Sequence, residues 1–328
     1  MDHVNTQVRH LFRAWLAGVA LIVALPCIGG SPPAVETAYR PSRLEDGRAD
    51  LQGIWVMSNL TPLERWPEFK TLVISPEEAR HLEARIRQLR DNPAIPAEPS
   101  QFDEERQVEP TRGELRSSII VEPRDGVIPG NALFKEQAAW FRANTLTVAD
   151  GPEQRPPPER CLSSPGTTPP MQSIVSLNLH QIVQTPDTIV IQSEWNRDAR
   201  FIRMNAQHAP AAITSWLGDS IGWWDGDTLV VETRYFAPSS HTRASALVLF
   251  FVSPQTVVTE RFTLVSSQEL EYVFTVVDET YYTSAWKGET HLRRAAGPIF
   301  EYACHEGNYS LTGILQGARA VEARQAVR

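Results

Sequence analysis

The chain has 328 residues, 42% of them hydrophobic and 21% charged, which is ordinary for a soluble globular protein and long enough for one large core or two smaller ones. Its formal net charge of −8 argues against a nucleic-acid partner, because phosphate binding needs a basic surface. The lysines Lys70, Lys135 and Lys287 lie in no setting that favours Schiff-base chemistry.

Residues 1–30 predict an export signal. Arg9 and Arg13 precede an apolar run, Ala14–Leu25, which is about half as long as a membrane-spanning helix and typical of a signal peptide. No clear cleavage motif follows, so the segment is either removed or kept as an N-terminal anchor, and Cys27 leaves a lipoprotein as a third alternative. We expect a periplasmic or secreted protein that contacts the membrane only through this segment, if it is retained.

Removal of the signal would leave two cysteines, Cys161 and Cys304. An even number of cysteines in an oxidising compartment predicts a disulfide between them. The alternative is two unrelated buried thiols.

The sequence of residues 39–170 predicts a short strand, a strand pair over Ser118–Ile128, two helices and loops. The strand is expected around Gly53–Ser58. Ser75 and Glu78 form a capping box at the start of the first helix, and the second helix is expected from Ala132 to Arg142.

Residues 171–310 predict a β-meander, because runs rich in Val, Ile, Thr and aromatic residues recur between turn sequences at about 10-residue spacing. The runs are Ile174–Gln184, Thr188–Trp195, Ala199–Met204, Thr228–Tyr235, Ala246–Val252, Val257–Val265, Glu269–Val277, Tyr282–Leu292 and Ile299–Cys304. Strands without intervening helices favour an antiparallel meander that closes into a calycin- or lipocalin-like barrel, since closure removes exposed edges. We expect this barrel to form a single domain over residues 39–320.

Several segments resemble a widespread group of exported bacterial proteins. The matching segments are Arg48–Trp55, Val121–Pro129, Arg160–Leu162, His180–Asp187, Asp198–Arg200, Trp216–Thr233 and Tyr302–Tyr309. The resemblance covers nearly all of the chain after the signal, which implies one integrated domain. It implies no activity, and the similarity to calycin-like barrels, which hold small apolar ligands, is an analogy at the level of fold.

Polar residues alternate along one stretch, at Glu194, Asn196, Asp198 and Arg200. In an extended chain these side chains share one face. Facing into a barrel they would be costly unless paired or functional, whereas facing outward they form an ordinary solvated surface. A turn between Glu194 and Asp198 would break the alternation.

The candidate catalytic residues follow from this stretch. We expect Asp198 and Arg200 on the barrel wall, with His241, Glu301 or His305 brought close by closure. Asp198, held ionised by Arg200, could orient a histidine for proton transfer near neutral pH. The alternative is a strand-end ion pair between Asp198 and Arg200, with Glu301 and His305 fixing the C-terminal segment.

Aromatic residues are dense in the second half of the chain, and most are expected to fill the core. A minority could line a ligand cavity at the mouth of the barrel. The candidate ligand-binding residues are Glu194, Trp195, Trp216, Trp224 and Tyr302.

Other motifs are weak. The Gly-Asp-Ser at residues 218–220 lacks the context of a serine hydrolase and indicates a turn. Neither a His-Glu-x-x-His nor a Cys-x-x-Cys spacing is present, so we predict no metal site. The alternative is a scattered site that uses His180, His208, His241 or His305. A glycine-rich phosphate loop is also missing from the sequence, which disfavours nucleotide cofactors.

These observations predict an exported, cofactor-independent enzyme that acts by acid–base chemistry on a small hydrophobic molecule such as a terpenoid, polyketide, steroid or aromatic compound. The reaction would be an isomerisation, cyclisation, hydration or hydrolysis. The main alternative is a non-catalytic periplasmic carrier of a lipophilic ligand. A third interpretation is a structural envelope protein, favoured only if the N-terminal segment is retained as an anchor. An interior row of ionisable groups would favour the enzyme, and an entirely apolar cavity would favour the carrier.

Overall fold

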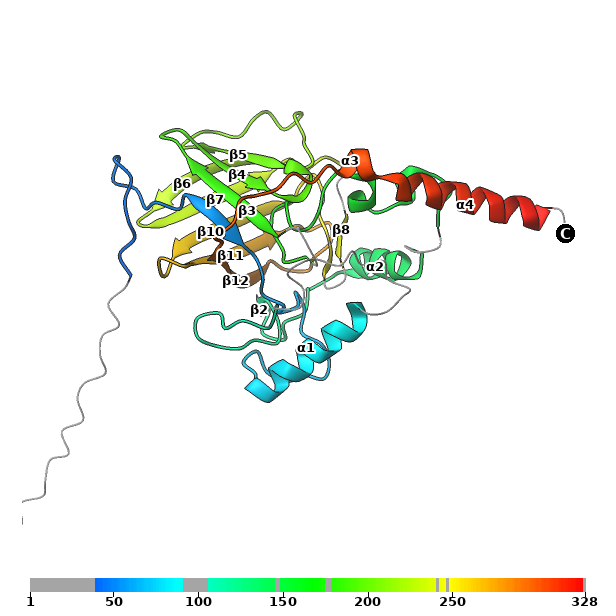
Figure 1. Ribbon diagram of the computed structural model, residues 1–328, viewed down its shortest axis with the longest axis horizontal. Helices are drawn as coiled ribbons and strands as arrows, with labels where there is room; N and C mark the ends of the chain where they lie inside the picture. The colour runs from blue at the N-terminus through cyan, green and yellow to red at the C-terminus, as the bar shows by residue number, and fades with distance from the viewer. Residues whose placement is uncertain are drawn as a thin grey trace, which may run out of the picture. The chain divides into compact units, whose positions relative to one another are not determined.

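The computed structural model describes residues 39–90, 106–144, 148–174, 178–239, 242–245 and 248–326 (Figure 1). Contacts group the chain from Tyr39 onward into one compact unit. The predicted signal, residues 1–30, lies outside the described residues. Within the described ranges, no helix has both the length and the apolar character needed to cross a membrane.

Nine strands form a closed barrel, which confirms the predicted mainly β barrel fold. In spatial order they are β1 (Gly53–Val56), β3 (Leu179–Gln184), β4 (Thr188–Ser193), β5 (Ala199–Met204), β6 (Asp219–Asp225), β7 (Thr228–Arg234), β10 (Val257–Leu264), β11 (Glu269–Val277) and β12 (Trp286–Arg294). Pairing of β1 with β12, with Trp55 opposite Arg294, closes the barrel.

The meander differs from the predicted one in its connectivity. Strands β5 and β6 are parallel, with Ile202 opposite Ser220, so the barrel is mixed rather than antiparallel throughout. Strand β1 lies within the predicted Gly53–Ser58 strand and joins the barrel, although the meander was predicted only over residues 171–310. The Ala246–Val252 run contributes β9 (Val248–Phe251), which pairs with β8 (Thr242–Ser245) in a separate hairpin, and Ile299–Cys304 forms no strand.

Alternation along the strands decides which side chains fill the barrel. In β10, Val258, Glu260, Phe262 and Leu264 are buried, whereas the residues between them are partly exposed. Large aromatic side chains complete the interior. On β12, Gly288 lies opposite Phe274 of β11, and a Cβ at position 288 would lie 2.2 Å from the Phe274 ring, so glycine is needed for this close approach.

The helices lie outside the barrel wall. In α1 (Pro76–Arg90), the predicted capping box is present: the Ser75 N–H donates to Glu78 Oε2 at 2.7 Å, and the Glu78 N–H donates to Ser75 Oγ at 3.2 Å. Helix α2 (Ala132–Asn144) agrees with its predicted range. The remaining elements are α3 (Cys304–Gly307), α4 (Tyr309–Ala326), β2 (Ile120–Glu122) and the 3-10 turns η1 (Pro152–Gln154), η2 (Pro157–Arg160) and η3 (Trp195–Arg197).

Residues 163–174 form a segment in which every residue is buried, and we call it the plug. Inside the barrel, the Met171 backbone N–H of the plug donates to the Tyr272 hydroxyl at 2.8 Å. The plug begins just after Cys161, which forms a disulfide with Cys304 across a Cα–Cα distance of 5.7 Å. The predicted disulfide is therefore confirmed, and it fits an oxidising, extracellular compartment.

Candidate functional site

A buried ion pair crosses the interior of the barrel. Arg200 Nη1 lies 2.6 Å from Glu260 Oε2, and the two side chains are 3% and 0% exposed. Because β6 and β7 separate β5 from β10 in the sheet, this pair spans the interior rather than joining neighbouring strands. The Tyr272 hydroxyl donates to Glu260 Oε1 at 2.7 Å. Burial and the neighbouring Glu260 carboxylate raise the pKa of Tyr272 well above its usual value, so the phenol stays protonated.

A histidine lies in the same interior. Strand register places His180 of β3 directly opposite Ser193 of β4, and His180 Nδ1 lies 3.0 Å from Ser193 Oγ. The imidazole is 1% exposed. Burial, and then the positive charge of Arg200, lower the pKa of His180 to about 4. The imidazole is therefore neutral at physiological pH.

We call His180, Ser193, Arg200, Glu260 and Tyr272 the interior polar cluster. Three of its buried atoms, His180 Nε2, Arg200 Nε and Arg200 Nη2, have no hydrogen-bond partner among the described residues. An unsatisfied buried donor or acceptor costs about 1–3 kcal/mol, so three such atoms in one cluster make it a candidate functional site.

The cluster has the parts needed for proton transfer. A neutral imidazole with a free ring nitrogen can accept a proton. A guanidinium with two free N–H groups can stabilise negative charge that develops on a substrate oxygen. Glu260 and Tyr272 hold that guanidinium in place, and Ser193 fixes the imidazole.

The predicted pairing of Asp198 with Arg200 is wrong. The 3-10 turn η3 breaks the alternation, with Asn196 at φ 52°, so Asp198 leaves the face that Arg200 occupies. Asp198 Oδ2 instead accepts from Thr167 Oγ1 of the plug at 2.8 Å. Burial raises the pKa of Asp198, in contrast to the lowered pKa expected beside an arginine.

Three other predicted residues lie in or beside the turn at 194–198. Glu194 is buried, and this burial raises its pKa. The rings of Trp195 and Tyr302 pack with their centroids 4.9 Å apart. The buried indole N–H of Trp195 has no partner in the described part of the chain. The turn at 194–198 is held to the plug by the hydrogen bond between Thr167 and Asp198. Asn196 Nδ2 also donates to the carbonyl of Cys161, just before the plug, at 3.1 Å.

Two of the remaining predicted residues, Glu301 and His305, are exposed and lie outside the buried interior polar cluster. Glu301 forms an exposed ion pair with Arg197 at 3.2 Å, and His305 is exposed on α3. Trp216 lies in the loop before β6, and Trp224 packs against the core near the far end of β6. His241 lies outside the described residues.

Sequence reasoning missed Glu260 and Tyr272, and it considered His180 only as a possible ligand of a scattered metal site. A signal for Glu260 was present, since Val258, Glu260 and Phe262 alternate on the apolar face of a clear strand. An acidic residue on such a face is either paired or functional. Its partner, Arg200, lies on a strand that is not adjacent to β10. The alternation of side chains along a strand does not predict which residues pair across the interior of a barrel.

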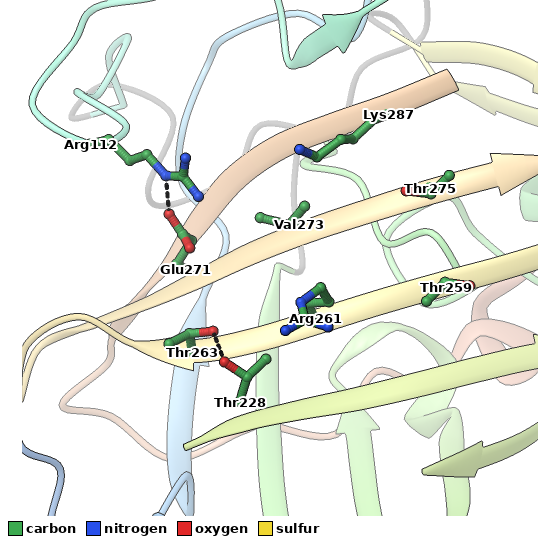
Figure 2. Close-up of a pocket in the computed structure, with 9 residues that line it drawn as sticks. All are labelled: Arg112, Thr228, Thr259, Arg261, Thr263, Glu271, Val273, Thr275 and Lys287. Carbon is green, nitrogen blue, oxygen red and sulfur yellow. Dashed lines mark hydrogen bonds and ion pairs between the residues drawn. The ribbon is translucent and has the colours of Figure 1, made fainter. Parts of the chain in front are cut away.

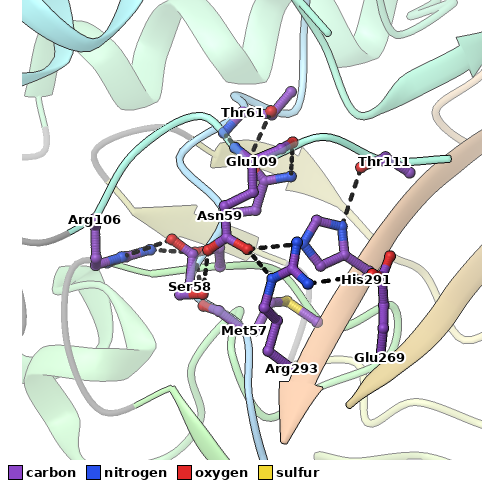
Figure 3. A network of polar contacts seen from close by, with 11 residues as sticks. Met57, Ser58, Asn59, Thr61, Arg106, Glu109, Thr111, Glu269, His291 and Arg293 are labelled. Carbon is purple, nitrogen blue, oxygen red and sulfur yellow. Dashed lines mark hydrogen bonds and ion pairs between the residues drawn. The ribbon is translucent and has the colours of Figure 1, made fainter. Parts of the chain in front are cut away.

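A second polar network lies on the outer face of β12 (Figure 3). Burial alone would raise the pKa of Glu109, but hydrogen bonds from His291, Ser58 and Arg293 lower it to about 2. His291 is held on both sides, with Nε2 3.0 Å from Glu109 Oε2 and Nδ1 3.2 Å from Thr111 Oγ1. Because these groups satisfy one another, the network fastens the 106–116 segment to the barrel.

The described residues contain no group of three or more His, Cys, Asp or Glu side chains arranged to hold a metal ion. Neither a comparison with protein-family models nor a comparison with curated proteins finds a match for the chain.

The buried histidine predicts a pH dependence of stability. Between about pH 6.5 and pH 4 the unfolded chain binds a proton at residue 180 that the folded chain does not, so stability falls as the pH drops through this window. The expected loss is about 3 kcal/mol. Urea unfolding at pH 7, 5.5 and 4 should show a smaller loss for His180→Gln than for the wild type.

The control for this measurement is His81→Gln, which removes an exposed histidine of α1 and should follow the wild-type pH dependence. Equal pH dependence of the His180 variant and the wild type would show that His180 titrates normally in the folded protein.

Proposed function

We propose that the protein is an exported, cofactor-independent enzyme that acts by acid–base chemistry on a small hydrophobic molecule, such as a terpenoid, polyketide, steroid or aromatic compound. The observation that carries the proposal is the free imidazole nitrogen of His180 beside a guanidinium, Arg200, with two free N–H groups. The disulfide supports a periplasmic or secreted location.

The cluster favours an isomerisation that begins with removal of a proton from the carbon next to a carbonyl group. Arg200 Nε and Nη2 would bind the carbonyl oxygen, and His180 Nε2 would take a proton from the adjacent carbon. Return of that proton to a different carbon completes the isomerisation with no change in oxidation state. Glu260 and Tyr272 are positioning residues, since they fix the guanidinium without facing the reacting atoms.

The second candidate is a carrier that binds a lipophilic ligand without turnover. It is favoured by the aromatic side chains of the interior, among them Phe262, Phe274 and Trp286, which are fully buried. The ionisable cluster favours the enzyme, because a ligand that is only carried does not need a buried arginine and histidine.

The test is hydrogen exchange between solvent and substrate. The protein is incubated in D2O with a panel of cyclic terpenoid, steroid and aromatic ketones, and deuterium incorporation is followed by mass spectrometry. Wild type should label at least one ketone, and His180→Gln should slow labelling by about 100-fold or more, as expected for the loss of a general base. The exposed His81→Gln serves as the matched control and should label at the wild-type rate.

The outcomes separate the two candidates. Retention of a ketone in native mass spectrometry without labelling would favour the carrier. Labelling at an unchanged rate in folded His180→Gln would place the chemistry outside the interior polar cluster.

A further inference from the structure

The outer face of the barrel carries a further polar site over strands β7, β10, β11 and β12. Its lining differs from both the interior polar cluster and the Glu109–His291 network. Strand register aligns outward-facing side chains of β7, β10, β11 and β12 in rows. The rows are Thr259–Thr275–Lys287, Arg261–Val273 and Thr228–Thr263–Glu271. Such rows follow from the period-two alternation of paired strands, which brings opposite residues within reach of each other.

A cavity of about 380 Å3 lies over these rows (Figure 2). Val273, a largely buried residue, lies in its middle, with threonine hydroxyls along β10 and β11. Arg112 reaches into it from the 106–116 segment, which the Glu109 and His291 network fastens to the barrel. The cavity is therefore lined by strand residues on one side and by a fixed loop residue on the other.

The lining contains three cationic side chains, Arg112, Arg261 and Lys287, and one carboxylate, Glu271. Acidic neighbours outside the lining offset part of this positive charge. Arg261 Nη2 is 2.7 Å from Asp225, an exposed partner outside the lining.

The other cations also have acidic neighbours. Lys287 Nζ is 3.2 Å from Glu289 Oε1 and 3.8 Å from Glu122 Oε1. Arg112 Nε bonds Glu271, and its Nη1 lies 3.6 Å from Glu289. Each guanidinium has five N–H donors, so these contacts leave donors on Arg112 and Arg261 for a ligand.

We propose that this cavity binds a small organic oxyanion, a carboxylate- or phosphate-bearing molecule with hydroxyl groups. Arginine presents a planar pair of donors that matches a carboxylate or phosphate, lysine adds a point charge, and the threonine hydroxyls bind the polar remainder of the ligand. The volume limits the ligand to a small molecule. This inference does not depend on the chemistry proposed for the interior polar cluster.

Isothermal titration calorimetry of the full chain tests the proposal with three probes: glucuronate, inorganic phosphate and, as the neutral reference, glucose. Wild type should bind at least one of the anions saturably at concentrations up to about 10 mM, and glucose at least tenfold more weakly. Binding of phosphate alone would indicate a phosphorylated ligand, and binding of glucuronate alone a carboxylate.

Arg261→Gln and Lys287→Gln should each weaken anion binding at least tenfold. Lys135→Gln removes the same charge from an exposed position on α2 and should leave affinity unchanged. If Lys287→Gln fails to fold, Arg261→Gln gives the same comparison, because the Arg261 side chain is 42% exposed. Absence of saturable binding by both anions, or equal affinity in wild type, Arg261→Gln and Lys135→Gln, would overturn the proposal.

Discussion

Replacing Glu260 by glutamine should lower the free energy of unfolding by about 3–5 kcal/mol, because it leaves the Arg200 guanidinium buried without a counter-charge. Arg200→Met should cost a similar amount, since it leaves the Glu260 carboxylate buried instead. Urea unfolding at pH 7 measures both changes.

The double variant Arg200→Met/Glu260→Gln distinguishes the energy of the charge interaction from the energy of side-chain packing. It should be more stable than the sum of the single losses predicts, since both charges are gone. Glu322→Gln breaks an exposed pair with Arg319 and should cost less than about 1 kcal/mol. Additive losses in the double variant would show that the two charges do not stabilise each other.

Removing the disulfide should have the other large effect. Cys161→Ser/Cys304→Ser frees a loop closed over a sequence separation of 143 residues, and the chain-entropy relation gives a loss of roughly 5 kcal/mol. The variant should also lose order in the plug, which follows Cys161 and contacts Tyr272. Hydrogen exchange at the Met171 amide measures this second effect.

Wild type treated with a reductant is the control for the cysteine substitutions themselves. It should unfold at the same urea concentration as the double serine variant. Equal unfolding midpoints for reduced and oxidised wild type would contradict a stabilising role of the disulfide.

Much of the barrel was predictable because its strands alternate between interior and surface. Strands β4, β5, β7, β10 and β11 fall within one or two residues of their predicted ranges. Strand β6 was missed because it is flanked by Gly218 and by the Asp225–Gly226 turn, and this turn-forming sequence was interpreted as a loop. Helix α4 was missed because the sequence reasoning assigned no element after Cys304.

The site was less predictable than the fold. Arg200 was found because it lies in a polar stretch, but its assigned partner was Asp198, two residues away in sequence. Local spacing cannot show that η3 turns the chain before β5. Nor can it show that Glu260, 60 residues further on, faces Arg200 across the barrel. The actual site depends on closure, which is a property of the whole fold.

The strand that closes the barrel has a consequence for folding order. Strand β1 is synthesised early, yet it pairs with β12, near the end of the described chain, through Trp55 opposite Arg294. A contact between such distant residues forms late, because the intervening loop must first be ordered. Until β12 arrives, one edge of β1 is unpaired and open to other chains. Completion of the C-terminal strands is therefore the step that protects a newly made molecule from aggregation.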